Sequence, residues 1–158
     1  MSDICVNLAM PSYLRQWFIN RHGGCEPVKL VRGSAESELL RMYTVRQPDG
    51  AVILPKQEGE VAICIPSYKN HDPRTYNYLT KQGKAALLDI IKNDFRVDMW
   101  EHLHAFENYG KEQKSLIYLY MEHRGIKEDG TCWDAIAKIY QRKRDSYKKQ
   151  LRRKNQKN

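Results

Sequence analysis

The sequence lacks long apolar runs and the short strings that mark common catalytic sites. No stretch reaches the roughly 18 apolar residues of a membrane-spanning helix. The first residues have neither the basic nor the apolar region of a secretory signal peptide. The strings GxxxxGK[ST], GxGxxG, GxSxG and HExxH are all absent, which argues against nucleotide-hydrolysing and Rossmann enzymes. We therefore expect a cytoplasmic protein, and we assign it no catalytic residue and no cofactor.

Cysteine is scarce, and no two cysteines have the close spacing of a metal site. The four are Cys5, Cys25, Cys64 and Cys132. We expect them to be reduced thiols that fill the core. The string His102-Leu103-His104 does not supply a metal site on a helix, because residues two apart point about 200° away from each other. We therefore predict no metal ion, and expect one packed and one surface histidine.

Charge is abundant but very unevenly distributed. The 158 residues carry a formal net charge of +8. Residues 1–137 contain 17 Lys and Arg against 18 Asp and Glu, whereas residues 138–158 contain 10 against one. A neutral body with a cationic end indicates an anionic partner at that end. Nucleic acid is the first candidate and an acidic membrane surface the second, while a merely solubilising tail remains the plain alternative.

The hydrophobic pattern predicts an α+β fold that begins with a small mixed sheet and two helices over residues 1–66. Strands are expected at 4–9, 28–31, 51–54 and 61–65. One helix is expected with Pro11 at its first position, and another is expected to open at Gly33-Ser34. Residues 67–78 are polar and contain proline, so they are expected to form a loop between two lobes.

Residues 79–158 have only helical patterns. Thr80 is placed to cap one helix, and Asp98 with Glu101 predicts the start of another. Further helices are expected over 111–124 and, with Thr131 as its cap, from 131 to about Arg153. Three successive helices with the basic one last suggest a trihelical lobe of helix-turn-helix type, although the turn over 125–130 is longer than usual.

The last predicted helix has a row of polar and cationic residues opposite its apolar stripe. At about 100° per residue, five of them fall within an arc of roughly 60°. They are Thr131, Lys138, Arg142, Lys149 and Arg153. Gln141 adds a group that could touch base edges, whereas Asp134 and Asp145 would oppose phosphate binding. A solvated helix end is the alternative, since cations are favourable near a helix C-terminus.

Two resemblances accompany this pattern. The string Trp133-x-x-Ile136-Ala137 resembles the W-x-x-I-A string of Myb/SANT domains, but here Gln141-Arg142-Lys143-Arg144 continues the helix without a break. The chain as a whole resembles small DNA-binding, helix-turn-helix-like proteins of phage-like and conjugative elements of Bacteroides-type bacteria. That resemblance lies in the strings 13–18, 72–79 and 136–144. It implies an accessory DNA-binding protein without an assigned reaction.

A second candidate site is the loop over 68–78, which interleaves aromatic and cationic side chains. Arg74 and Tyr76 are its proposed nucleic-acid contacts, through phosphate binding and base stacking. The alternative is that Tyr76 and Tyr78 pack the loop onto the body while Asp72 pairs with Arg74.

These patterns predict a nucleic-acid-binding accessory or regulatory protein that contacts double-stranded DNA through its last helix, with no membrane partner. The alternative is an interaction module that docks this helix on an acidic protein, or a homodimer. A nucleic-acid-processing enzyme with Tyr76 or Tyr78 as nucleophile is the third possibility, for which the sequence offers no base or metal partner.

Overall fold

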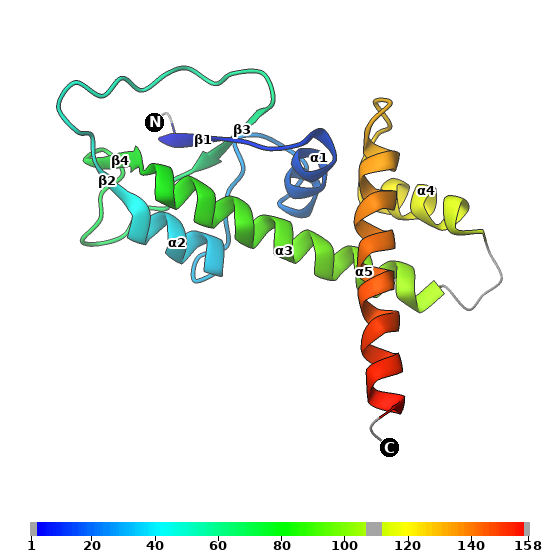
Figure 1. Ribbon diagram of the computed structural model, residues 1–158. Coiled ribbons are helices and arrows are strands. Elements are labelled where there is room, and N and C mark those ends of the chain that lie inside the picture. The colour runs from blue at the N-terminus through cyan, green and yellow to red at the C-terminus, as the bar shows by residue number, and fades with distance from the viewer. Residues whose placement is uncertain (1–2, 107–111, 157–158) are drawn as a thin grey trace. The chain divides into compact units, whose positions relative to one another are not determined.

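The computed structural model describes residues 3–106 and 112–156, which form two compact units. The first unit is Met1–Asp94 and the second is Phe95–Asn158. The boundary between them falls inside one long helix, α3 (Lys81–Phe106), which contributes to both units (Figure 1). The expected boundary at 67–78 differs from this division, because the end of that segment is a strand of the first unit.

The first unit contains two small antiparallel sheets (Figure 1). In one, β1 (Cys5–Ala9) pairs with β3 (Glu60–Cys64), and in the other β2 (Thr44–Arg46) pairs with β4 (Tyr76–Leu79). Alternate residues of β1 and β3 are buried, as expected for strands with one face on a core. The α+β class is therefore confirmed, but two antiparallel pairs replace the single mixed sheet.

Two of the four expected strands are wrong in whole or in part. Residues 51–54 have no strand structure, and Val52, Ile53 and Leu54 are exposed. Of residues 28–31, Val28 alone makes a bridge, parallel to Ile63. Apolar, β-branched residues favour a strand only where a neighbouring strand pairs with them, and that neighbour is missing along 51–54.

The two shorter helices of the first unit begin within one residue of the starts that the sequence predicts. α1 (Ser12–Arg21) starts directly after Pro11, and α2 (Ala35–Tyr43) starts after Ser34. The Ser34 hydroxyl accepts a hydrogen bond from the Ser37 amide at 3.2 Å. At the start of α3, the Thr80 hydroxyl accepts from the Gly83 amide at 3.0 Å, which confirms that cap.

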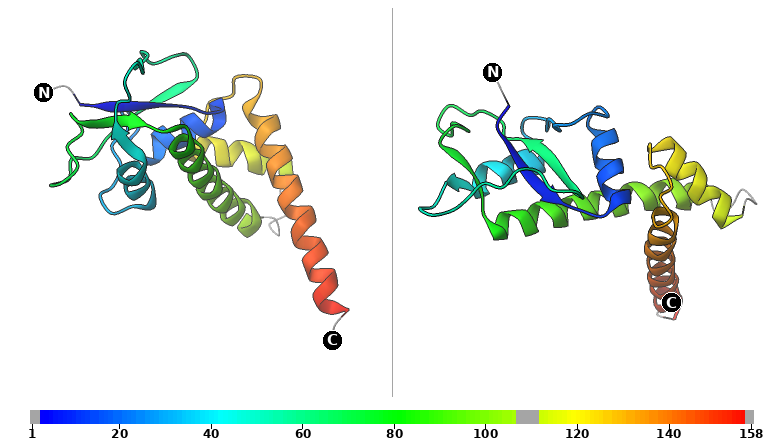
Figure 2. Two further views of the ribbon diagram at one scale, coloured as in Figure 1. Left: turned by 60° about the vertical axis from the view of Figure 1, so that its left-hand side comes forward. Right: turned by 90° about the horizontal axis from the view of Figure 1, so that it is seen from above.

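The second unit consists of the end of α3, α4 (Gln113–His123) and α5 (Cys132–Asn155), which are visible in both views of Figure 2. Its core is made by apolar and aromatic residues from all three helices and from the turn after α4. They are Phe95, Met99, Leu103, Leu116, Ile117, Tyr120, Met121, Ile126, Cys132, Ile136 and Tyr140. None of the helices described is long and apolar enough to cross a membrane.

The helix start expected at Asp98 is wrong, because α3 continues through this residue without interruption. The Asp98 carboxylate accepts two hydrogen bonds from Arg124, both at 2.8 Å, and one from the Tyr120 hydroxyl at 2.9 Å. The residue is therefore a tertiary contact between α3 and α4 rather than a cap. The break expected at 108–110 lies outside the described residues.

Candidate nucleic-acid interface

The start of α5 is fixed by acidic side chains of the preceding turn. The Glu128 carboxylate accepts hydrogen bonds from the amides of Gly130 at 2.7 Å, Cys132 at 3.2 Å and Trp133 at 2.8 Å. Thr131 is exposed and does not cap the helix with its side chain, contrary to expectation. Instead its hydroxyl donates to Asp129 at 2.6 Å. The longer side chain of Glu128 accepts hydrogen bonds from the first amides of the helix, which Thr131 was expected to cap.

The inner face of α5 is held by buried residues and by an aromatic cluster. Tyr140 is 2% exposed, and its ring centroid lies 5.8 Å from that of Trp100 on α3. Two turns later, the Tyr147 ring lies 5.5 Å from Trp100 and 5.1 Å from His104. These contacts anchor α5 as far as Tyr147, two turns beyond Tyr140, the last of its buried residues.

The outer face of α5 carries the predicted contacts, and all of them are exposed. They are Thr131, Lys138, Gln141, Arg142, Lys149 and Arg153. The cations among them lie opposite the buried Ile136 and Tyr140 on the helical wheel. Residues 138–156 hold nine Lys and Arg against one Asp. The second half of the helix is therefore a strongly positive surface element.

Two side chains moderate this surface. Asp145 lies on the same face and accepts a hydrogen bond from Gln141 at 3.0 Å. Arg144 is half-buried, and its guanidinium donates to the Gln113 side chain at 3.2 Å. Gln141 therefore already has a partner within the helix, and Arg144 serves the contact with α4 rather than the outer face.

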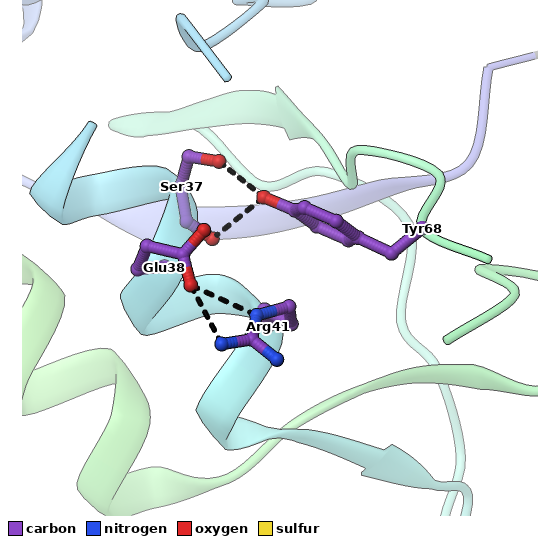
Figure 3. A network of polar contacts seen from close by, with 4 residues as sticks. All are labelled: Ser37, Glu38, Arg41 and Tyr68. Atoms are coloured by element: carbon purple, nitrogen blue, oxygen red, sulfur yellow. Dashed lines mark hydrogen bonds and ion pairs between the residues drawn. The ribbon is translucent and has the colours of Figure 1, made fainter. Parts of the chain in front are cut away.

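The loop before β4, in the first unit, is organised around two tyrosine rings. The Tyr68 hydroxyl contacts Ser37 of α2, beside the Arg41–Glu38 ion pair (Figure 3). The guanidinium carbons of Arg32 and Arg41 lie 5.6 and 5.7 Å from the centre of the Tyr68 ring. At these distances the arginines interact with the ring through cation–π contacts.

Tyr76 is enclosed in a similar way. His71 stacks on its ring at 4.3 Å, and the guanidinium of Arg46 lies 5.7 Å from its centre. Arg74 is exposed, and its backbone amide donates to Asp72 at 2.9 Å. The His71 ring therefore covers a face of Tyr76 on which a base would stack, which favours the alternative that Tyr76 packs within the protein.

The histidines of α3 are half-buried on different partners. His102 lies against Tyr120 and His123 at ring distances of 5.3 and 5.4 Å, whereas His104 stacks on Trp100 at 4.6 Å. Neither is the surface residue that the sequence suggested. Burial, followed by the charge of Arg124, lowers the pKa of His102.

One group of possible metal ligands occurs among the described residues. It is Glu128, Asp129 and Cys132, whose ligand atoms lie within 4.8 Å of one another. The carboxylates are already used by the backbone at the start of α5. The arrangement is explained by helix capping.

Sequence reasoning missed the three arginines around the tyrosine rings, Arg32, Arg41 and Arg46. They come from separate segments, so no local motif joins them to the loop. Comparisons with known protein families, curated proteins and solved structures give no match for this chain.

Proposed function

We propose that this protein binds nucleic acid, and duplex DNA in the first place, through the outer face of α5. The observation that carries the proposal is a 24-residue helix with a buried inner face and an exposed, cationic outer face. A helix of this diameter fits the major groove of B-DNA, and lysine and arginine bind its phosphates. The net positive charge of residues 138–158 exceeds what is needed to stabilise the C-terminal end of a helix.

Lys138, Arg142 and Lys149 are the proposed phosphate contacts. They are exposed, and they fall within about 40° of one another on the helical wheel. Arg153 continues the same row one turn later. Asp145 interrupts the row with a negative charge, so contact is expected on both sides of it rather than evenly along the helix.

The test is fluorescence anisotropy with a labelled duplex and the full chain, at several salt concentrations. Replacing Lys138, Arg142 and Lys149 together with Gln should weaken binding at least about tenfold. It should also make the negative slope of log K against log salt less steep by about 2 to 3, since each lost phosphate contact removes about one unit. Glutamine keeps the length and helix propensity of the side chain, so circular dichroism should be unchanged.

A matched control removes the same charge from another helix. Lys81, Lys84 and Arg96 are exposed residues of α3, and their triple replacement with Gln also lowers the net charge by three. If the two triple variants lose equal affinity, the binding depends on net charge and the assignment to α5 is wrong. If the wild type does not bind duplex DNA at low salt, the proposed duplex-DNA interface on α5 is wrong, and an acidic protein partner becomes the next candidate.

A further inference from the structure

Two of the four cysteines face each other across the first sheet. Cys5 is in β1 and Cys64 is in β3, and the register places them directly opposite. Their Sγ atoms are 3.8 Å apart and share a thiol hydrogen bond. Both thiols are free and half-buried. The sequence separates them by 59 positions, so only the fold brings them together.

The hydrogen bonds of the sheet define the geometry at this pair. The Ile65 amide donates to the Ile4 carbonyl at 2.9 Å, so the neighbouring pair is hydrogen-bonded within the ladder. The Cys64 amide donates instead to the Val28 carbonyl at 2.8 Å, away from β1. Cys5 and Cys64 are therefore a non-hydrogen-bonded pair, in which Cα atoms lie about 4.5 Å apart and side chains are closest.

This geometry is compatible with a covalent bond. Disulfides join Cα atoms that are about 4.4 to 6.8 Å apart, and the S–S bond is about 2.05 Å long. Side-chain rotation is enough to close the present gap between the sulfurs. The other two cysteines are differently placed, since Cys25 is exposed and Cys132 is buried in the second unit.

We propose that Cys5 and Cys64 form a reversible intramolecular disulfide when the protein meets a low-molecular-weight disulfide such as oxidised glutathione. In the first step the Cys5 thiolate attacks one glutathione sulfur, and reduced glutathione leaves and takes up a proton. In the second step the Cys64 thiolate attacks the Cys5 sulfur of this mixed disulfide and releases the second glutathione. Two cysteine thiols are oxidised, and one glutathione disulfide is reduced to two thiols.

The surroundings of the pair determine which sulfur reacts first. Burial raises the pKa of the Cys5 thiol, but the hydrogen bond from Cys64 opposes this effect. Burial, together with the Cys5 sulfur, raises the pKa of Cys64 to about 12. We therefore expect the Cys5 thiolate to attack first, which the Cys64→Ala variant below tests. Because the thiolate is the reactive form, the rate should rise about tenfold for each pH unit while the pH is below the pKa of Cys5.

The bond would fasten β1 to β3 and constrain the chain between them. A cross-link that closes a long loop stabilises a fold by restricting its unfolded state. We therefore expect the oxidised protein to unfold at a higher urea concentration than the reduced protein. Because the bond lies within the first unit, this effect is independent of the role of α5 in nucleic-acid binding.

The experiment incubates the reduced full chain with oxidised glutathione at pH 8 and follows its intact mass, with linkage mapping after proteolysis. The expected product has lost two hydrogens, contains a Cys5–Cys64 linkage, carries no glutathione on either residue, and is reversed by dithiothreitol. A stable glutathione adduct on Cys5, or a linkage to Cys25, would overturn the proposal. Neither outcome depends on the folding of a variant.

Two variants sharpen the result. Cys64→Ala removes the resolving thiol, so this protein should stop at a glutathione adduct on Cys5. Cys25→Ser removes the exposed thiol, which has no part in the proposed bond, and should form the disulfide as fast as the wild type. A Cys64→Ala protein that gains no adduct at Cys5 while its circular dichroism matches the wild type would refute the assigned order of attack.

Discussion

The contact of Asp98 with Arg124 and Tyr120 permits a quantitative prediction. Asp98→Ala removes three hydrogen bonds that join α3 to α4. Tyr120 is fully buried, so its hydroxyl would be left without this acceptor, at a cost of about 1 to 3 kcal/mol. The Arg124 and Asp98 side chains are 36% and 23% exposed, so solvent screening limits their ion pair to about 1 kcal/mol. Together the substitution should lower the free energy of unfolding by about 2 to 4 kcal/mol.

The assay is urea unfolding followed by circular dichroism, with two comparison variants. Tyr120→Phe removes the buried hydroxyl but keeps the ion pair, so it should cost only about 1 kcal/mol. Glu101→Ala replaces an exposed carboxylate one turn further along α3, and should change stability by less than about 0.5 kcal/mol. The reasoning is refuted if Asp98→Ala costs no more than Glu101→Ala, or if Tyr120→Phe is the more damaging change.

Two further predictions concern the first unit. In Gly83→Ala the new Cβ would lie 2.8 Å from Leu79 Cδ1 and 3.0 Å from Tyr43 Cγ, so the change should destabilise by about 1 to 3 kcal/mol in urea unfolding, although alanine normally favours a helix. A gain in stability would contradict this crowding. The ring of His71 is hydrogen-bonded to the Thr44 hydroxyl at 2.8 Å. Burial, followed by the charge of Arg41, lowers the pKa of His71. The unfolded chain therefore binds a proton at this histidine more readily than the folded protein does. Neutral His71 contributes to stability above about pH 6.5, and this contribution is lost as the pH falls below that value. His71→Gln should accordingly lose less stability than the wild type between about pH 7 and pH 5, and equal losses would show that His71 does not contribute.

Local signals in the sequence predicted those parts of the fold that depend on neighbouring residues. The cap at Thr80 and the helix start at Gly33-Ser34 could be predicted because each depends on residues only a few positions apart. Asp98 was misinterpreted because an acidic residue three positions before a glutamate has the same pattern in a cap and in the middle of a helix. Its actual partner, Arg124, is 26 positions away, so no local rule could identify it.

The candidate site shows the same limit. The exposed row on α5 followed from the helical period alone, so Lys138, Arg142 and Lys149 could be selected before the fold was known. The Cys5–Cys64 pair could not, because it depends on the register between two strands that are more than 50 residues apart. The strand predicted over 51–54 is absent for a related reason: the β-propensity of these residues does not provide a neighbouring strand with which they could pair.

The distal part of α5 behaves as a short polyelectrolyte. From Lys148 to residue 156 every side chain is exposed, so tertiary packing adds little to its helical conformation. Its cations repel one another along the helix, since Lys148 and Arg152, and Lys149 and Arg153, are each four residues apart. Dissolved salt or a polyanion relieves this repulsion and shifts the local helix–coil equilibrium towards helix. The helix content of this segment is therefore coupled to the ionic strength. An anionic partner would increase that helix content as it binds, because its negative charge reduces the repulsion between the cations.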